Sequence, residues 1–478
     1  MNITQKATRT AIGAGIDLGL NHAKKNPQEG ISDILNVLDK FYKPTKDDKK
    51  LSGGNAFSGM ISQVNDPESK WGPYANKILK NVNQHQIKTL LLNLAYEAGY
   101  KGLAKVRATS EKYDCNVPWT ILFDPTSACN MHCKGCWSGE YGNKDNLSFE
   151  EMDSIVTQGK ELGTHFYLLT GGEPLVRKNE IIKLAKKHSD CVFQAFTNGT
   201  LVDEAFAIEM EKLGNIMLGI SLEGLEEQND FRRGKGCFKA VMKAMDILKA
   251  HKLAFGLSIC WTKYNCETVL SEEFLNLVEE KGALYAWYFH FMPVGEKTTN
   301  ELVPTTEQRR VFIKRLREVR SSHNPHQILP IDFQNDAEFV GGCIAGGRHF
   351  LHINPLGDVE PCVFIHYSTA NIKRDTLLEA LQQPLFMQYR KRQPFNENML
   401  RPCPMLENPE NLPDMVEKAG AKSTDFTDPE VAKHLTDKNV EYAKAWAPVA
   451  DEIWKEMVAE KEAKKKSKEN SGNKVVND

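Results

Sequence analysis

A regular alternation of short apolar runs with helical patterns begins at Trp119, and it restricts the fold more than any other feature of this chain. Strands that alternate with helices form right-handed βαβ units and therefore a parallel sheet. The pattern predicts six strands at 119–125, 165–172, 191–199, 216–224, 255–262 and 285–295, separated by helices at 149–163, 178–188, 203–213, 237–252 and 271–281. We therefore predict an α/β fold with six strand–helix repeats, either as an open sheet or curled into a barrel.

Every predicted strand ends in a polar or glycine-rich motif. In parallel α/β sheets the chemistry lies at the carboxyl ends of the strands. The predicted site is therefore at that edge of the sheet. The first predicted helix opens with Ser148 and has Glu151 three residues later, which is the pattern of a capping box.

The rest of the chain divides around this alternation. Residues 1–112 are predicted as a helical N-terminal region with a polar loop at 43–73 and an amphipathic stretch at 74–108. The core is expected at 113–325, a small α+β cysteine-containing module at 326–412, helices at 413–456 and a disordered polar tail at 457–478.

Composition narrows the possible functions. The 61 Lys+Arg and 63 Asp+Glu residues give a net charge of −2, so a general nucleic-acid binder is not expected. No apolar run approaches the ~20 residues of a membrane span, although the amphipathic N-terminal helices leave peripheral membrane contact open. Residues 1–15 lack the apolar core of a signal peptide, so we expect a cytoplasmic location. The 11 cysteines then indicate metal or redox chemistry rather than disulfides.

Three cysteines follow the first predicted strand within eight residues: Cys129, Cys133 and Cys136. Thiolates are soft ligands that favour zinc or an iron–sulfur cluster. A zinc site requires a fourth ligand, for which His132 and His165 are candidates. A [4Fe–4S] cluster held by three cysteines instead leaves one iron open to another ligand.

The C-x3-C-x2-C spacing at the end of the first strand resembles the radical S-adenosylmethionine (radical SAM) enzymes. The resemblance implies a partial (β/α)6 TIM-like barrel, a [4Fe–4S] cluster and SAM as cofactors. It further implies that SAM is cleaved reductively to a 5′-deoxyadenosyl radical, which abstracts hydrogen from the substrate. A flavodoxin- or ferredoxin-like protein is the expected reductant. A non-catalytic iron–sulfur redox or sensor protein is the alternative interpretation.

The same resemblance assigns SAM-binding residues to the ends of successive strands. The residues are Gly171, Gly172, Glu173, Pro174, Asn198, Ser221, Glu223, Arg232, Thr262 and Pro293. Glu223 stands where relatives more often have Asp. Gly135 stands where many relatives have an adenine-facing aromatic residue. Trp137 either takes that role or packs in the interior, and no catalytic side chain is assigned.

A second set of cysteines, Cys343, Cys362 and Cys403, lies in the C-terminal module. The sequence INPLGDV between the first two predicts a hairpin around a Pro–Gly turn. The module resembles a shortened SPASM/Twitch extension, which binds auxiliary iron–sulfur clusters. At most one auxiliary cluster is expected, with His349, His352, His366, Asp358 or the substrate as its fourth ligand. The alternative is a module that keeps its fold and has lost the cluster.

The substrate is not identified by the sequence. SPASM-like relatives often modify peptides or proteins, and other radical SAM proteins modify or couple lipid chains. The amphipathic N-terminal helices and the aromatic run at 285–295 are compatible with an apolar substrate. Peptide and lipid substrates therefore both stay open.

Overall fold

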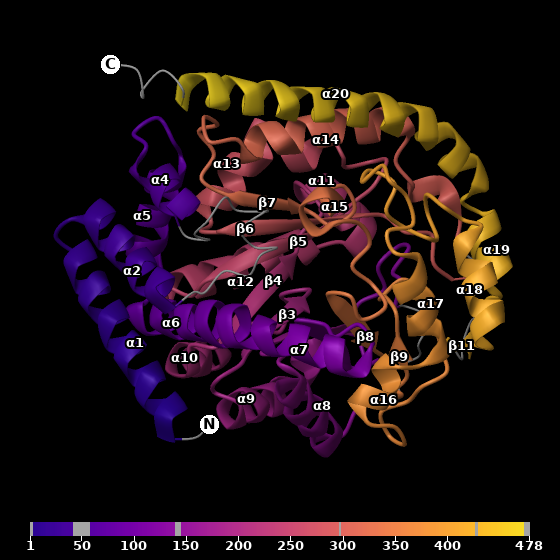
Figure 1. Cartoon of the computed structure of the whole chain (residues 1–478), viewed down its shortest axis with the longest axis horizontal. Helices are drawn as coiled ribbons and strands as arrows, with labels where there is room; N and C mark the ends of the chain where they lie inside the picture. The colour runs from indigo at the N-terminus through magenta and orange to yellow at the C-terminus, as the bar shows by residue number, and fades with distance from the viewer. Residues whose placement is uncertain (1–2, 42–57, 139–144, 296–297, 426–428, 473–478) are drawn as a thin grey trace.

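The computed structural model describes residues 3–41, 58–138, 145–295, 298–425 and 429–472 (Figure 1). The described N-terminal residues form only helices. These are α1 (Ile3–Ala23), α2 (Pro27–Phe41), α4 (Ser58–Asn65), α5 (Trp71–Asn81), α6 (Gln84–Leu90), the π-helix η1 (Leu91–Gly102) and α7 (Leu103–Tyr113). The predicted helical N-terminal region is confirmed. Its loop at 43–73 lies partly outside the described residues, and the described part contains α4.

The six predicted strands are all present and pair in parallel in chain order. They are β1 (Thr120–Thr126), β2 (Phe166–Gly171), β3 (Val192–Thr197), β4 (Ile216–Ser221), β5 (Phe255–Trp261) and β6 (Tyr285–His290). The connecting helices are α8 (Phe149–Leu162), α9 (Lys178–Lys187), α10 (Glu204–Leu213), α11 (Glu226–Arg233), α12 (Cys237–Ala250) and α13 (Glu272–Glu280). The predicted capping box is confirmed, because the Ser148 hydroxyl accepts from the Glu151 amide and the Glu151 carboxylate accepts from the Ser148 amide.

Three further strands extend this sheet beyond the six that the sequence predicts. The order is β7-β6-β5-β4-β3-β2-β1-β8-β9, with β7 (Leu329–Asp332) beside β6 and β8 (Phe350–Ile353) parallel to β1. Only β9 (Val359–Glu360) is antiparallel, as the return strand of the predicted hairpin, and Gly357 in its turn has φ of 92°. The sheet has two edges, β7 and β9, as expected for a partial rather than a closed barrel. The predicted α/β fold class is confirmed.

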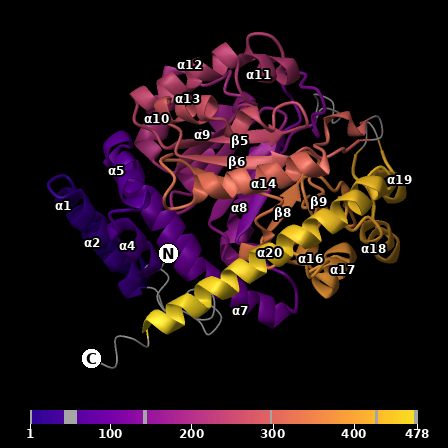
Figure 2. The ribbon, with the colours of Figure 1, turned by 90° about the horizontal axis from the view of Figure 1, so that it is seen from above.

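The C-terminal part packs against both edges of the sheet. It contains α14 (Thr306–Arg320), α15 (Ala337–Val340), β10 (Tyr367–Ser368), α16 (Leu377–Leu381), α17 (Pro384–Arg392), α18 (Asn411–Ala419), β11 (Lys422–Ser423), α19 (Ala432–Asp437) and α20 (Val440–Gly472). The long helix α20 runs along α14 (Figures 1 and 2). It continues well beyond residue 456, where we expected helix to give way to a disordered tail.

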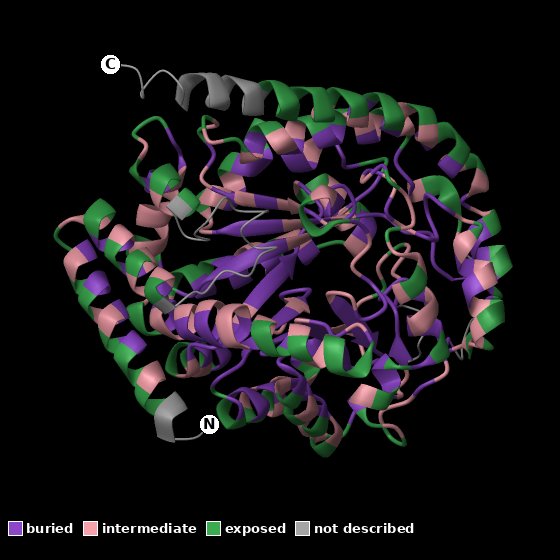
Figure 3. Ribbon diagram, in the orientation of Figure 1, coloured by how far each residue is buried: buried purple, intermediate pink, exposed green. Residues whose placement is uncertain are grey.

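Burial follows the layers of this fold. The strands are almost entirely buried, whereas the covering helices are exposed on their outer faces (Figure 3). The main apolar core lies between the sheet and the helices α8–α13, and a separate cluster joins α1, α2, α6 and η1 to the amino-terminal edges of β5 and β6. Within the described residues, no helix combines the length and hydropathy that a membrane crossing requires.

Candidate active site and second cysteine site

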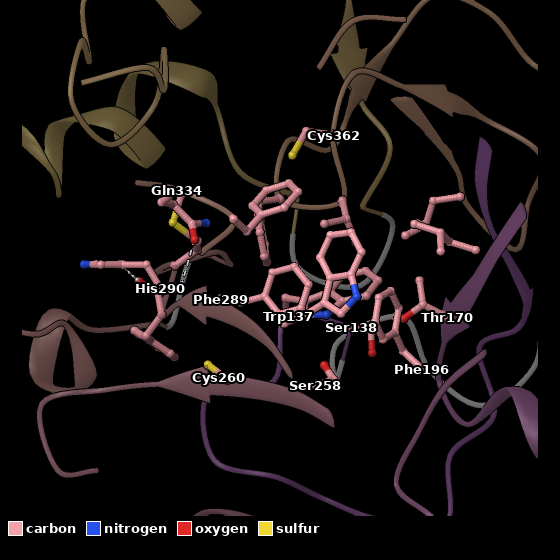
Figure 4. Close-up of a pocket in the computed structure, with 18 of the residues that line it drawn as sticks. Trp137, Ser138, Thr170, Phe196, Ser258, Cys260, Phe289, His290, Gln334 and Cys362 are labelled. Carbon is pink, nitrogen blue, oxygen red and sulfur yellow. Dashed lines mark hydrogen bonds between the residues drawn. The ribbon is translucent and has the colours of Figure 1, made fainter. Parts of the chain in front are cut away.

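One cavity of about 1520 Å³ extends along the inside of the barrel, from the first residues of β1 and β2 to the carboxyl ends of the strands. Its wall includes all six cysteines that the sequence singles out as cluster ligands. Aromatic residues form much of the remaining wall, including Phe196, Trp287, Phe289, Phe333 and Phe350. Figure 4 shows Trp137 and Phe289 pointing into this space, with Cys362 on the side of the C-terminal module and Cys260 on the side of the barrel. The two predicted cysteine sites therefore share a single chamber.

The first cysteine loop follows β1 directly and lines the cavity with Cys129, Cys133 and Cys136. Burial raises the pKa of Cys129 to about 11, and the thiols of Cys133 and Cys136 add to this shift. Burial also raises the pKa of Cys133, against the opposite effect of two neighbouring arginines, Arg233 and Arg232. The three thiols thus lie within electrostatic reach of one another beside positive charge.

Close packing requires glycine at two positions, one in this loop and one in the segment opposite the loop. Gly135 has φ of 64°, and a Cβ there would lie 2.6 Å from the Phe291 ring. A Cβ on Gly172 would lie 2.2 Å from the Ala128 carbonyl oxygen, so the end of β2 touches the cysteine loop through backbone alone. An aromatic residue at position 135 is sterically excluded, which explains this departure from the common pattern.

The donor set fits an iron–sulfur cluster better than a single ion. Within the described ranges, no three His, Cys, Asp or Glu side chains are grouped closely enough to hold one metal ion. The three thiols nevertheless converge on one cavity, and soft thiolates are the ligands of iron–sulfur clusters, which are wider than one ion. His132 lies on the same wall as the three cysteines but forms no close group of metal ligands with them among the described residues. The buried His165 ring lies off this wall, 3.3 Å from the Asp190 carbonyl oxygen.

Glu173 connects the ends of β2 and β3. Its carboxylate accepts hydrogen bonds from the Leu175 amide (2.9 Å), the Thr197 hydroxyl (2.7 Å) and the Asn198 amide (2.7 Å). Burial raises the pKa of Glu173, and these donors act in the opposite direction. The carboxylate is fixed on the cavity wall next to the cysteine loop.

Glu223 lies behind the cavity wall and holds two arginines. Its carboxylate is fully buried and accepts from Arg232 Nη1 (2.8 Å), Arg233 Nε (2.8 Å) and the Cys260 amide (2.9 Å). Both guanidinium groups reach the cavity, and Arg233 lies 4.0 Å from Cys133 Sγ. The structure thus gives Glu223 a positioning role, while Arg232 and Arg233 face the site.

The predicted SAM residues fall into two groups. Those that line the cavity are Gly171, Gly172, Glu173, Asn198, Ser221 and Arg232. Those that do not are Pro174, Glu223, Thr262 and Pro293. Thr262 instead belongs to a turn in which Asn265 Oδ1 accepts from the Thr262 amide (2.6 Å).

Trp137 packs toward the C-terminal module. Its ring makes edge contacts with His352, Phe364 and His366, at centroid distances of 5.7, 6.5 and 6.1 Å. The residue after the third cysteine therefore joins the barrel to the module, and the same ring lines the cavity.

The second cysteine site is assembled from three separate segments. Cys343 follows α15, Cys362 follows β9 and Cys403 precedes α18, and all three line the cavity. Burial raises the pKa of Cys343 to about 11 and raises those of Cys362 and Cys403 further. The Cys343 thiol acts electrostatically on both other thiols, so the predicted proximity of Cys343 and Cys362 is found.

Most candidates for a fourth ligand at this site have other partners. The His352 ring lies 3.0 Å from Asp124 Oδ1 and 2.6 Å from Glu360 Oε2, and the His366 ring is 3.0 Å from the Val363 carbonyl oxygen. Asp358 accepts from Asn354 and Asn371. His349 alone among these four lines the cavity, and burial lowers its pKa to about 4.

The N-terminal helices contribute a part of the wall that the sequence analysis missed. Gly99, Leu103 and Arg107 line the cavity from the continuous helix formed by η1 and α7. Their spacing of four residues places them on one helix face. That spacing was visible in the sequence, but nothing there indicated which element this face would meet.

Comparison with known protein families separates the barrel from the C-terminal module. The model of the radical SAM superfamily matches residues 123–269, and that of the SPASM iron–sulfur cluster-binding domain matches residues 343–405. The chain therefore contains a radical SAM domain followed by a SPASM domain, and the predicted resemblance to these two families is confirmed. The two domains imply a [4Fe–4S] cluster, SAM and an auxiliary iron–sulfur cluster as cofactors, as the sequence analysis predicts.

The names of individual relatives indicate different reactions. The Fe-coproporphyrin III synthase of Methanosarcina barkeri is 27% identical, over 46% of this chain and 57% of that protein. The alignment therefore spans little more than half of that relative. The PqqA peptide cyclase of Granulibacter bethesdensis is 25% identical, over 51% of this chain and 67% of that protein. The structure of Streptococcus suis SuiB bound to its precursor peptide SuiA has a TM-score of 0.54 at 16% identity, covers 69% of this chain and 79% of SuiB, and shows the shared fold.

Proposed function

We propose that this chain binds a [4Fe–4S] cluster through Cys129, Cys133 and Cys136, binds SAM beside it and removes hydrogen from an apolar substrate. The observation that carries the proposal is the one cavity that the three thiols share with the strand-end motifs and the aromatic wall. When bound, the cluster supplies the electron that splits SAM into methionine and the 5′-deoxyadenosyl radical, which takes hydrogen from the substrate. A flavodoxin- or ferredoxin-like reductant and a cytoplasmic location belong to the same proposal.

We assign the SAM contacts to the strand-end residues that line the cavity. Gly171 and Gly172 leave backbone accessible, and the fixed carboxylate of Glu173 is an acceptor for the ammonium group of SAM. Arg232, whose guanidinium group donates to Glu223, is the cation for the carboxylate of SAM. Asn198 and Ser221 supply further polar groups. Pro174, Thr262 and Pro293 support these loops from behind the wall.

The shape and lining of the cavity favour a lipid chain as the substrate. A volume of about 1520 Å³ exceeds the ~300–1000 Å³ of usual small-molecule sites, so it has room for a long chain in addition to SAM. An aromatic wall offers few partners to the amide groups of a peptide, each of which requires a hydrogen bond when buried. A peptide is the second candidate, because one relative is named a peptide cyclase.

A substitution on the N-terminal helix tests the substrate part of the proposal. Reconstituted protein is expected to form 5′-deoxyadenosine from SAM and dithionite. Leu103→Trp narrows the cavity from the N-terminal helix, which carries none of the predicted SAM residues, so it should keep this reaction. Cells with the variant should lose the lipid product that untargeted lipid and peptide comparison finds with the wild-type protein.

Ala104→Trp is the matched control, because Ala104 is exposed on the same helix and does not line the cavity. It should keep both the SAM reaction and the product. Absence of 5′-deoxyadenosine from the reconstituted wild-type protein would refute the proposed activity. A product unchanged in Leu103→Trp would refute the cavity assignment, and a modified peptide in place of a lipid would establish the second candidate.

A further inference from the structure

One end of the cavity lies at the amino-terminal side of the sheet, against the continuous helix of η1 and α7. Gly102, at the junction of η1 and α7, packs against the turn that precedes β2, and a Cβ on Gly102 would lie 2.4 Å from the Gly163 carbonyl oxygen. Gly163 has φ of 111°, and a Cβ there would lie 2.9 Å from the backbone nitrogen of Val106. Contact through backbone atoms therefore fixes the first turns of α7 beside the amino-terminal end of β2.

Arg107, the residue after Val106, brings a positive charge to this end of the cavity. Its side chain is half-buried and lines the cavity together with Leu103, one helical turn earlier. The neighbouring wall is aromatic, because Trp119 and Phe166, at the starts of β1 and β2, pack with ring centroids 5.4 Å apart. A guanidinium group beside an apolar wall attracts an anion more strongly than one in bulk water, since less solvent screens its charge.

The acidic residues of the cavity wall come from the opposite end. Among the described residues that line the cavity, they are Glu173, Glu301, Asp332 and Asp336. Glu173 follows β2, Glu301 follows β6, and Asp332 is the last residue of β7, with Asp336 after it. The wall therefore carries its acidic side chains at or beyond the carboxyl ends of strands, whereas its amino-terminal end carries Arg107.

The space between Arg107 and the first cysteine loop suits an elongated molecule. The seven residues of β1 separate Trp119 from that loop and span about 20 Å at ~3.3 Å per residue. Apolar side chains line the cavity over this length, including Leu122, Leu168 and Phe196. A long apolar wall with a cation at one end matches an amphipathic molecule that has an apolar chain and an anionic head group.

We propose that Arg107 binds the anionic head group of the substrate, a carboxylate or a phosphate, at the end of the cavity away from the first cysteine loop. This assignment rests on the proposed function, in which the substrate is a lipid chain, and it adds the charge and the orientation of that chain. The guanidinium group donates to the oxygens of the head group, and the chain extends along the aromatic wall toward the first cysteine loop. Arg107 thus determines specificity and takes no part in the chemistry.

The test measures the binding of decanoate, decyl phosphate and decanol, three chains of equal length, to the reconstituted protein with SAM and without reductant. Isothermal titration calorimetry should show that the wild-type protein binds at least one of the two anions more tightly than decanol. Arg107→Gln should weaken the binding of that anion by about 10- to 100-fold, the effect of one hydrogen-bonded charge, and should leave decanol binding unchanged. The comparison of decanoate with decyl phosphate identifies the preferred head group.

Lys105→Gln is the matched control, because Lys105 is exposed on the same helix and does not line the cavity. It removes the same charge and should leave all three affinities unchanged. Arg107→Lys should keep part of the preference for anions, because it keeps the charge but loses the paired donors.

Three results would overturn the assignment of Arg107. The first is equal affinity of the wild-type protein for decanol and both anions. The second is a loss of anion binding in Arg107→Gln that Lys105→Gln matches, and the third is a loss in Arg107→Gln that is as large for decanol as for the anions. A wild-type protein that cleaves SAM but binds none of the three chains would refute the lipid substrate itself, and the role of Arg107 with it.

Discussion

The two cysteine sites open into one cavity but are built in different ways. The first comes from a single loop of eight residues between Cys129 and Cys136, directly after β1. The second comes from three segments spread over Cys343 to Cys403, which the fold brings together. A motif of the first kind is readable from spacing alone, whereas a site of the second kind depends on the packing of β8, β9 and α17.

The charges around the two sites also differ. Arg232 and Arg233 act on Cys133 in the first site and lower the pKa of that thiol against the effect of burial. In the second site Cys403 lies next to Glu407, which raises the pKa of that thiol further. Arg232 and Arg233 can pair with a ligand that brings a carboxylate to the first site. The second site is suited to a buried, permanently held group.

The largest expected difference between the two sites appears when one thiol is removed from each of them. Cys133→Ala should lose one cluster of iron, and 5′-deoxyadenosine formation should fall to the background of the assay, because the SAM-binding iron is no longer held. Cys362→Ala should lose the other cluster and keep 5′-deoxyadenosine formation from dithionite and SAM. Iron analysis and chromatography measure both, and equal loss of activity in the two variants would contradict this division.

A buried ion pair supports the second site only, and its removal should have the next largest effect. Arg309 is fully buried and donates to Glu407 at 2.8 Å, while Glu407 also accepts from the Cys403 amide at 2.8 Å. Arg309→Met leaves the Glu407 carboxylate buried without its partner, which costs about 3–5 kcal/mol. Denaturant unfolding should show this loss, and the auxiliary iron should be lost before that of the first cluster.

Arg315→Met is the control for this pair, because Arg315 contacts the exposed side chain of Glu272. Exposed pairs contribute about 0–1 kcal/mol, so the free energy of unfolding should change little. Equal destabilisation by the two substitutions would show that the Arg309 pair has no special part in holding the second site.

The last prediction concerns the contact between the two regions, where the effect depends on pH. His352 on β8 lies between Asp124 on β1 and Glu360 on β9, with none of the three exposed. Burial works against the charged ring, but the two carboxylates raise the pKa of His352 to about 10. Because this pKa exceeds the ~6.5 of an unfolded histidine, the stabilisation is complete below about pH 6.5 and is lost as the pH rises toward 10.

The expected slope is up to about 1.4 kcal/mol of unfolding free energy per pH unit between pH 7 and 9. His352→Asn should remove this slope, while other groups that titrate in the same range contribute equally to both proteins. Parallel stability curves for the two proteins would show that His352 is not charged in the folded state.

Much of the barrel was predictable because its signals are local. The run at 119–125 predicts β1 to within one residue at each end, and Ser148 with Glu151 predicts the start of α8. The spacing of Cys129, Cys133 and Cys136 predicts the first site for the same reason: one short loop after a strand carries all its members. Local propensity and periodicity fix such features regardless of the rest of the chain.

The role of Glu223 was not predictable in this way. At its strand end Glu223 resembles a residue that touches SAM, but the fold buries it behind Arg232 and Arg233. Such roles arise from contacts between distant segments, which leave no periodic trace.

The amino-acid sequence by itself determined the alternation of strands and helices, the edge of the sheet where the chemistry lies and the first cysteine loop. Only the tertiary structure decided that β8 pairs with β1, that both cysteine sites open into one cavity, and that an N-terminal helix face completes its wall. The physical reason is the range of the interactions. Hydrogen bonds within one turn or loop are set by neighbouring residues, whereas the burial of apolar surface selects partners from the whole chain.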